Sequence, residues 1–260
     1  MNRLDFLIDY LLKEEKRFSG MQIPNNEEEK QNLFRALRNM RLPKPVSEEF
    51  LRLQDEELQE QLSKKGIVDL KDITLTDKED RNIKLWQGDI TRLKVDAVVN
   101  AANSQLLGCF YPMHKCIDNA IHSSAGVQLR EECNELMTKQ AKEESTGKAK
   151  ITLAYNLPSK YVIHTVGPII YGNEPTKEEQ ELLQSCYLSC LHLAKEKNLK
   201  SIAFCCISTG EFHFPNRLAG EIAVKTVKDF LKKENYEITV VFNVFKTDDL
   251  LIYKNLLKIE

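Results

Sequence analysis

The sequence has no long hydrophobic run and no excess of positive charge. No apolar stretch approaches the roughly 20 residues that span a bilayer, and residues 1–17 lack a continuous apolar signal core. The formal net charge is -2, so no general basic field attracts a nucleic-acid backbone. We therefore expect a cytoplasmic protein that spans no membrane and binds no nucleic acid.

The sequence also lacks an even cysteine framework, internal repeats and low-complexity linkers. Its cysteines number seven, and in a reducing compartment they are expected to be core residues or metal ligands rather than disulfides. The 260 residues are 42% hydrophobic and 29% charged, which is enough to bury a full core. The composition predicts a globular protein with one large domain or a domain with an appendage.

Residues 1–66 are polar and acidic, and they show three amphipathic helical patterns. Asn26 and Glu29 resemble a capping box at the start of the second helix. Ser47 is a plausible cap for the third helix, which Gly66 would end. Because these helices carry no recognisable chemistry, we expect an N-terminal helical extension that serves in packing or dimerisation.

From residue 67 onward, short β-type runs alternate with helical patterns. Helices are predicted from residue 118 or 126 to 137, over 176–197 and 217–233, and from 247, with Thr247 as a cap. Strands are predicted over 73–75, 83–86, 95–99, 149–154, 161–165, 201–207 and 238–245. This alternation predicts an α/β domain over residues 67–260, with a mixed sheet and helices on both faces.

Residues 100–122 gather carboxamides, two thiols, two imidazoles and a carboxylate in one short segment, and we take it as the reactive centre. The segment follows the buried strand predicted over 95–99. Asn100 and Asn103 are therefore expected to emerge at the carboxyl end of that strand. Open α/β sheets bind their ligands at that edge.

Three residues of this segment have the spacing of metal ligands. Cys109, His114 and Cys116 form the pattern CxxxxHxC, which lets one loop wrap a tetrahedral zinc ion. Incidental thiols beside a surface histidine are the alternative. Three other cysteines could in principle supply a fourth ligand: Cys133, Cys205 and Cys206. Helix and strand periodicity favours core positions for all of them. The pattern therefore favours one zinc ion with an open fourth position.

Asp118 lies two residues after the last of these ligands and just before a helical pattern. Its carboxylate is placed to orient a water beside the metal. Asp is also a common helix N-cap, and the two roles are compatible. His164 lies within a predicted strand and His192 within a predicted helix, so both are interpreted as packing or surface residues.

Two further stretches suggest nucleotide contacts. Asp89 follows a strand and Gly88, where it could accept a hydrogen bond from an adenine amino group, although Gly-Asp is also an ordinary turn pair. Residues 207–212 follow an apolar strand and precede a helix, so their backbone N–H groups and hydroxyls could bind a diphosphate. A capped turn is the alternative there. A single glycine excludes both the dinucleotide fingerprint and the P-loop pattern.

Taken together, five segments resemble, in order, the landmarks of the macrodomain family, an ADP-ribose-binding three-layer α/β/α fold. They are QGDIT (87–91), NAAN (100–103), DNAIHSSAG (118–126), VIHTVGP (162–168) and ISTGEFHFP (207–215). In the hydrolytic branch a glycine-rich run follows NAAN, and residues 109–116 replace it here. This departure resembles the zinc-containing bacterial macrodomains, which also carry an N-terminal helical extension.

The resemblance implies roles for particular residues. Asp89 and Ile90 would contact the adenine, and Asn103 would bind the distal ribose. The segment Cys116, Ile117 and Asp118 would face the bond to be broken. The diphosphate loop would consist of Ser208, Thr209, Gly210, Glu211 and Phe212, with Phe212 near the ribose.

The resemblance also implies an activity, the removal of mono-ADP-ribose from acidic side chains of a modified protein. Relatives of this kind tend to be encoded with a sirtuin-type ADP-ribosyltransferase and a lipoylated carrier protein, which makes that carrier a candidate substrate. Our leading hypothesis is a zinc-dependent hydrolase in which Asn103 fixes the ribose and Asp118 positions or deprotonates the attacking water. The alternatives are a non-catalytic ADP-ribose reader with a structural zinc, and an O-acetyl-ADP-ribose deacetylase.

Overall fold

The computed structural model describes residues 2–172 and 174–259, and six strands in this part of the chain form one sheet. In spatial order they are β2 (Ile83–Gln87), β8 (Thr239–Val244), β7 (Ser201–Phe204), β4 (Ala97–Ala102), β6 (Tyr161–Val166) and β5 (Ala149–Leu153). Neighbouring strands are parallel except β5, which is antiparallel to β6. The predicted mixed sheet is confirmed.

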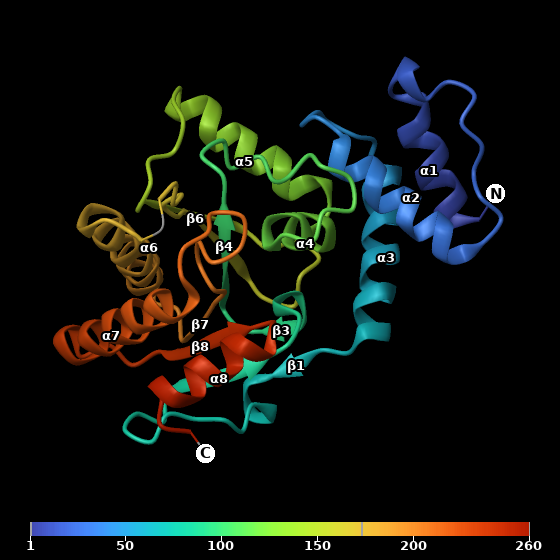
Figure 1. Ribbon diagram of the computed structural model, residues 1–260. Coiled ribbons are helices and arrows are strands. Elements are labelled where there is room, and N and C mark those ends of the chain that lie inside the picture. Colours follow the sequence, from blue (N-terminus) through green and yellow to red (C-terminus); the bar gives the residue numbers. More distant parts are fainter. Residues whose placement is uncertain (1, 173, 260) are drawn as a thin grey trace.

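Helices cover both faces of this sheet (Figure 1). One face carries α4 (Ile117–Ala125) and α5 (Val127–Gln140), and the other carries α6 (Lys177–Glu196), α7 (Asn216–Glu234) and α8 (Thr247–Leu256). The central strands are apolar on both faces, as a doubly covered sheet requires. The predicted α/β/α arrangement of three layers is therefore confirmed.

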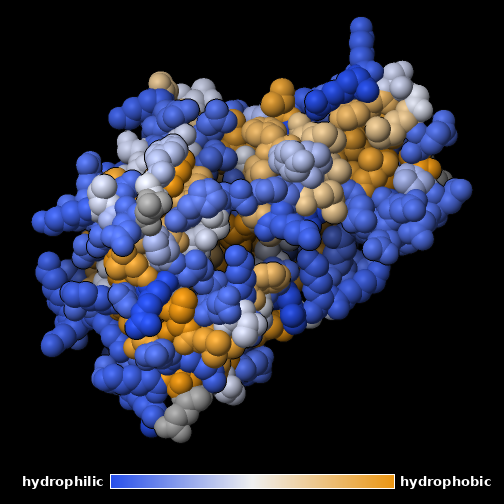
Figure 2. Space-filling model, viewed as in Figure 1, coloured by the Kyte–Doolittle hydropathy of each residue, from blue (hydrophilic) through white to orange (hydrophobic). Residues whose placement is uncertain are grey.

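The N-terminal residues form α1 (Arg3–Lys13), α2 (Glu27–Met40) and α3 (Glu48–Lys65). These helices share a small apolar cluster of their own, which includes Leu7, Phe34 and Phe50 and reaches Val127 of α5. The surface in Figure 2 is mainly hydrophilic, with apolar residues gathered toward these helices. The division of the chain at residue 66 stays a prediction.

Short elements complete the chain. Among the described residues, the 3-10 turns are η1 (Lys16–Phe18), η2 (Leu70–Asp72) and η3 (Ile90–Arg92). β1 (Val68–Asp69) pairs in parallel with β3 (Leu93–Lys94). In the part of the chain that the structure describes, no helix combines the length and the apolar composition needed to cross a membrane.

Several local predictions hold in detail. Asn26 accepts a hydrogen bond from the Glu29 N–H at 3.1 Å as the N-cap of α2, although the reciprocal bond of a capping box, from the Asn26 N–H to the Glu29 side chain, is not formed between these two described residues. Ser47 caps α3 in the same way through the Phe50 N–H. Gly66 ends α3 with a φ of 78°, in the left-handed region that favours glycine.

Others were wrong. Residues 73–75 form no strand. Next to them, Thr76 makes an isolated bridge with Lys84 of β2, and Lys84 Nζ also donates to the Ile73 carbonyl at 2.9 Å. The strand predicted over 201–207 ends at Phe204, which leaves a longer loop before α7. Thr247 is the first helical residue of α8 rather than its cap, and the capping position is held by Lys246 without a side-chain hydrogen bond.

Candidate functional site

Two loops meet at the carboxyl edge of the parallel strands. Residues 103–116, which we call the metal loop, connect β4 to α4, and residues 205–215 connect β7 to α7. β4 and β7 are neighbours in the sheet, so their loops leave the same edge. His114 Nε2 of the metal loop lies 3.7 Å from Glu211 Oε1 of the other loop. The site predicted from these two stretches is thus a single region.

The carboxylate of Asp118 is held by two carboxamides. Asn100 Nδ2 donates to Asp118 Oδ1 at 2.8 Å, and Asn103 Nδ2 donates to Oδ2 at 3.3 Å. Asn103 follows β4 as expected. The expectation that Asn100 also emerges from the strand was wrong, because β4 continues to Ala102 and Asn100 is fully buried. Asn100 is a positioning residue that the sequence did not reveal.

Burial raises the pKa of Asp118 to about 6, although the hydrogen bond from Asn100 and the charge of Arg130 act in the opposite direction. A carboxyl group with such a pKa can accept a proton near neutral pH, which is the property a general base needs. The neutral His122 ring lies beside it, with Nε2 3.5 Å from Asp118 Oδ1. Asp118 is therefore both oriented and chemically suited to activate water.

The N-cap of α4 is Cys116 rather than Asp118. The Sγ atom of Cys116 accepts a hydrogen bond from the Asn119 N–H at 3.4 Å, and Asp118 lies inside the first turn. The capping role considered for Asp118 is therefore filled by a neighbouring thiol. Ile117, the first helical residue, is half-buried against the main core.

The three predicted metal ligands lie together. One ligand atom from each of Cys109, His114 and Cys116 falls within 4.8 Å of the others, and Cys109 Sγ is 3.7 Å from His114 Nδ1. Zn–S and Zn–N bonds of ordinary length in a tetrahedral site separate such atoms by about 3.6 Å. Two thiols and one imidazole therefore fit zinc. Among the described residues no fourth side chain joins this group, so one coordination position would stay open.

Burial raises the pKa of the Cys116 thiol to about 12, and the neighbouring Cys109 and Asp118 add to the rise. Two thiols and a carboxylate close together resist ionisation unless a cation joins them, and a coordinated thiol is deprotonated. The other cysteines considered as ligands lie elsewhere: Cys133 and Cys205 are buried in the main core, and Cys206 packs against it.

A second group of ligand atoms lies deeper. His122, Cys133 and His164 also meet within 4.8 Å, but all three are buried. The His164 ring already contacts Asn100 Nδ2 at 3.2 Å and Thr152 Oγ1 at 3.0 Å. We assign this group to the core, in agreement with the interpretation of His164 from sequence.

Asp89 is the N-cap of η3. Its Oδ1 accepts from the Thr91 N–H at 3.0 Å and the Thr91 hydroxyl at 2.7 Å. Its Oδ2 lies 3.7 Å from Lys65 Nζ and remains available as an acceptor. Ile90 is buried in the main core, so only its backbone is placed to contact a ligand.

The 205–215 loop carries free backbone donors. Within residues 2–172 and 174–259, the N–H groups of Ser208 and of residues 210–212 donate no hydrogen bond, whereas Thr209 N–H bonds to the Cys206 carbonyl. α7 begins only at Asn216, so the predicted helix N-terminus is absent from this anion site. Phe212 is half-buried, and its carbonyl accepts from the Ile170 N–H. A turn of free amides can still bind a diphosphate.

Gly167 explains why the VIHTVGP segment lies next to this loop. A Cβ atom built on Gly167 would fall 2.0 Å from Ser208 Oγ. Ser208 itself is buried and has a φ of 64°. The absence of a side chain at Gly167 therefore lets the 205–215 loop approach β6. Gly167 was not identified as a site residue from sequence, and Asn100 was expected at the strand end rather than buried against Asp118, because each acts only through another residue.

The fold and the site together describe an α/β/α protein whose candidate site lies at the carboxyl edge of the parallel strands of a mixed sheet. Residues 99–223 match the family model described as Macro domain. A protein-ADP-ribose hydrolase of Treponema medium is 53% identical over 253 residues, which cover 97% of this chain and 97% of that protein. One of Staphylococcus aureus (strain MRSA252) is 50% identical over 252 residues, covering 97% and 94%. The chain belongs to the macrodomain family.

Solved structures agree with this assignment. The Trypanosoma brucei macrodomain in complex with ADP-ribose superposes with a TM-score of 0.67 at 30% identity and covers 85% of this chain and 94% of that one. The Oceanobacillus iheyensis macrodomain with MES bound gives a TM-score of 0.62 at 39% identity, covering 68% and 90%. The similarity to the Treponema and Staphylococcus proteins spans nearly the whole chain, so it includes the N-terminal helices.

Proposed function

We propose that this chain is a hydrolase that binds ADP-ribose and removes it from mono-ADP-ribosylated proteins. Relatives named protein-ADP-ribose hydrolase share about half of its residues over nearly its full length, which confirms the expectation of an enzyme. A macrodomain structure that contains ADP-ribose supports the ligand.

The observation that carries the catalytic part of the proposal is the carboxylate of Asp118, held by Asn100 and Asn103 at the sheet edge from which the 205–215 loop also leaves. The loop amides would bind the diphosphate and Asn103 the distal ribose. Asp118 would take a proton from water. The water oxygen would then form a bond to the substrate while the bond between the ribose and the modified carboxylate breaks. The products are free ADP-ribose and the restored acidic side chain.

We further propose that Cys109, His114 and Cys116 hold one zinc ion. When bound, zinc would supply a Lewis acid beside the reacting ribose. The donor set and its spacing support this assignment. The resemblance to zinc-containing bacterial macrodomains supports two further predictions: a preference for Asp and Glu linkages, and a lipoylated carrier protein modified by a sirtuin-type transferase as the substrate. The cytoplasmic location expected from the sequence also stays a prediction.

The test is an assay of ADP-ribose release from glutamate-, arginine- and serine-modified proteins, with and without a zinc chelator. We expect release from the glutamate-modified protein and its loss with the chelator. Binding of ADP-ribose without release from any protein would instead identify a reader. Faster turnover of O-acetyl-ADP-ribose than of modified protein would favour the deacetylase. Release that is insensitive to complete zinc removal would reject the zinc requirement alone.

A further inference from the structure

The sequence suggests that the N-terminal helices only pack or dimerise, but α2 does more than that. One side of α2 joins the apolar cluster with α1 and α3. Another side packs against α4, whose N-cap is Cys116 (Figure 1). This second side is polar and buried, and its side chains make directional hydrogen bonds to the metal loop.

Asn39, near the carboxyl end of α2, is 1% exposed. Its Oδ1 accepts from the Met113 N–H at 3.1 Å, and its Nδ2 donates to Ser123 Oγ of α4 at 2.9 Å. Met113 has a φ of 59°, an uncommon backbone conformation for a side chain of its size. Met113 directly precedes His114, so Asn39 fixes the turn that presents this imidazole.

Arg35 lies one turn earlier on α2. Its Nη2 donates to the His114 carbonyl at 3.3 Å and to Asn119 Oδ1 at 2.7 Å. Asn119 in turn donates from its backbone N–H to Cys116 Sγ and from Nδ2 to the Tyr111 carbonyl at 3.0 Å. Arg35 therefore contacts the segment that carries two of the three proposed ligands.

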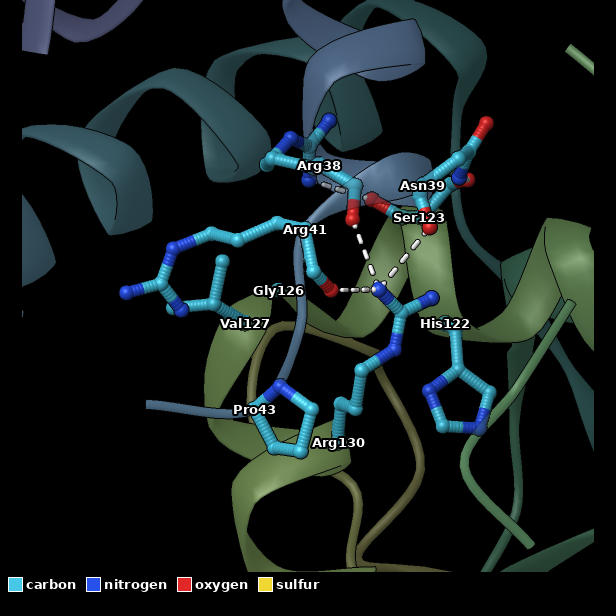
Figure 3. Close-up of a pocket in the computed structure, with 9 residues that line it drawn as sticks. All are labelled: Arg38, Asn39, Arg41, Pro43, His122, Ser123, Gly126, Val127 and Arg130. Carbon is cyan, nitrogen blue, oxygen red and sulfur yellow. Dashed lines mark hydrogen bonds between the residues drawn. The ribbon is translucent and has the colours of Figure 1, made fainter. Parts of the chain in front are cut away.

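Arg130 of α5 bonds to the end of α2 (Figure 3). Its Nη1 donates to the carbonyls of Arg38 and Asn39 at 2.9 Å and also to the carbonyl of Arg41. The last carbonyls of a helix have no hydrogen-bond partner within the helix, and Arg130 supplies one here. Its Nε donates to the Leu107 carbonyl of the metal loop at 2.7 Å. The end of α2 and the start of the loop are thereby fixed to one guanidinium.

The seam between α2 and α4 leaves little room for a ligand. A cavity there, lined by Arg38, Arg41, His122 and Arg130 among others, has a volume of about 10 Å³. That is the lower limit for a single water molecule. The buried polar side chains of this seam therefore serve contacts within the protein rather than the binding of a second substrate.

We propose that α2 is the positioning element of the metal loop, with Asn39 and Arg35 as the positioning residues that bring Cys109, His114 and Cys116 together. The side of α2 that carries Arg35 and Asn39 thus supports the metal loop, whereas its other side packs with α1 and α3. This inference rests on the proposed function only for its metal. The hydrogen bonds that carry it join protein groups alone.

The experiment compares Asn39→Leu, Asn39→Asp and Gln31→Leu in the full chain. Asn39→Asp keeps the acceptor for the Met113 N–H. Gln31→Leu is the matched control, because Gln31 also lies on α2 but bonds to Glu57 of α3 at 2.6 Å and not to the loop. Three quantities are measured: zinc affinity by chelator competition, hydrogen exchange of the amides of residues 109–116, and the melting temperature.

We expect Asn39→Leu to weaken zinc binding by about 10–100-fold, the usual effect of losing a group that orients a metal ligand. It should also speed exchange of the loop amides, and Asn39→Asp should restore both. Gln31→Leu should change neither, even where it lowers the melting temperature. If Asn39→Leu does not fold, Arg35→Leu takes its place with the same expected result, because Arg35 is only half-buried.

Unchanged loop exchange in the Asn39 or Arg35 variant would overturn the proposal, and so would equal changes in that variant and in Gln31→Leu. A wild-type protein without zinc would reject the metal part of the proposed function. The exchange measurement would still decide whether α2 positions the loop, because it requires neither metal nor activity.

Discussion

Asn100 and Asp118 are joined by a hydrogen bond of 2.8 Å that runs from the interior of β4 to the first turn of α4. Both side chains are buried. The carboxylate is therefore fixed by the rigid sheet and not by the flexible backbone of a loop. A general base held in this way needs no reorganisation when substrate binds, which is the advantage of a pre-organised site.

Replacing Asp118 by Asn should abolish its function as a base while keeping its size. We expect turnover to fall by about 10²–10⁴-fold, the usual contribution of a general base. The affinity for ADP-ribose should stay within about threefold, because the groups proposed to bind it are Asp89, Asn103 and the 205–215 loop. Kinetics of ADP-ribose release and calorimetric binding measure the two quantities. Undiminished release would remove Asp118 from the mechanism.

Asp89→Asn should shift the nucleobase preference from the adenine of ADP-ribose toward the base of the inosine analogue. The variant keeps one oxygen for the Thr91 N–H and places an NH₂ group where Oδ2 would accept from adenine in the proposed complex. Affinity for ADP-ribose should fall by about 1.5–3 kcal/mol, the range for a hydrogen bond to a charged group. Affinity for the inosine analogue should rise, because its carbonyl accepts from the new donor. Equal affinity of the wild type for both ligands would contradict the adenine assignment.

Cys116 has two roles that one pair of variants can separate. Cys116→Ser keeps an oxygen to cap α4, whereas Cys116→Ala loses both the cap and the thiolate. Both should lose zinc, and the Ala variant should be less stable than the Ser variant by about 0.5–2 kcal/mol, the value of an N-cap. Metal analysis and urea unfolding test this.

The control for these metal measurements is Cys206→Ser, which should keep one zinc per chain because Cys206 lies outside the ligand group. A metal-free wild type with full activity would end the zinc hypothesis.

Gly167→Ala should displace the 205–215 loop, because the new Cβ would meet Ser208 Oγ at 2.0 Å. Overpacking of this kind costs about 1–3 kcal/mol, and we expect the cost to appear mainly in ADP-ribose binding. The double variant Gly167→Ala with Ser208→Ala should recover part of it, since the remaining contacts of the Cβ are 3.0 Å and longer. A double-mutant cycle on affinity measures the coupling. Simple additivity of the two changes would refute the steric explanation.

Acid should destabilise the fold through buried histidine. Burial lowers the pKa of His164 to about 3, whereas an unfolded histidine titrates near 6.5. The unfolded chain therefore takes up the proton first, and stability present above pH 6.5 is lost progressively toward pH 3. At pH 5 this group alone accounts for about 2 kcal/mol. Burial also lowers the pKa of His122, which adds to the loss, while the raised pKa of Asp118 opposes it below about pH 6.

Urea unfolding of the metal-free protein at pH 7.5 and pH 5 tests this expectation. The loss of unfolding free energy should be smaller in His164→Asn than in the wild type. His192→Gln is the control, because His192 is exposed and should leave the loss unchanged. Equal losses in all three proteins would show that His164 is protonated without cost in the folded state.

The sequence by itself determined the architecture, and it predicted the residues proposed for the site. Short β-type runs that alternate with helical patterns predicted a mixed sheet between helices, because strands buried on both faces are apolar along their whole length. Asn103, Asp118 and the three proposed metal ligands lie within 16 residues of one another, so their proximity follows from the chain itself. Caps such as Ser47 were also predictable, because they depend on hydrogen bonds between near neighbours.

Only the tertiary structure decided the relationships between distant segments. The contacts of Asn39 with Met113, of Arg130 with the end of α2 and of Gly167 with Ser208 join residues about 40 to 90 positions apart. The hydrophobic periodicity of the sequence does not predict such pairs, because each pair depends on how two elements of secondary structure pack against each other. The same reason explains why Asn100 looked like a residue at a strand end, when packing had buried it against Asp118.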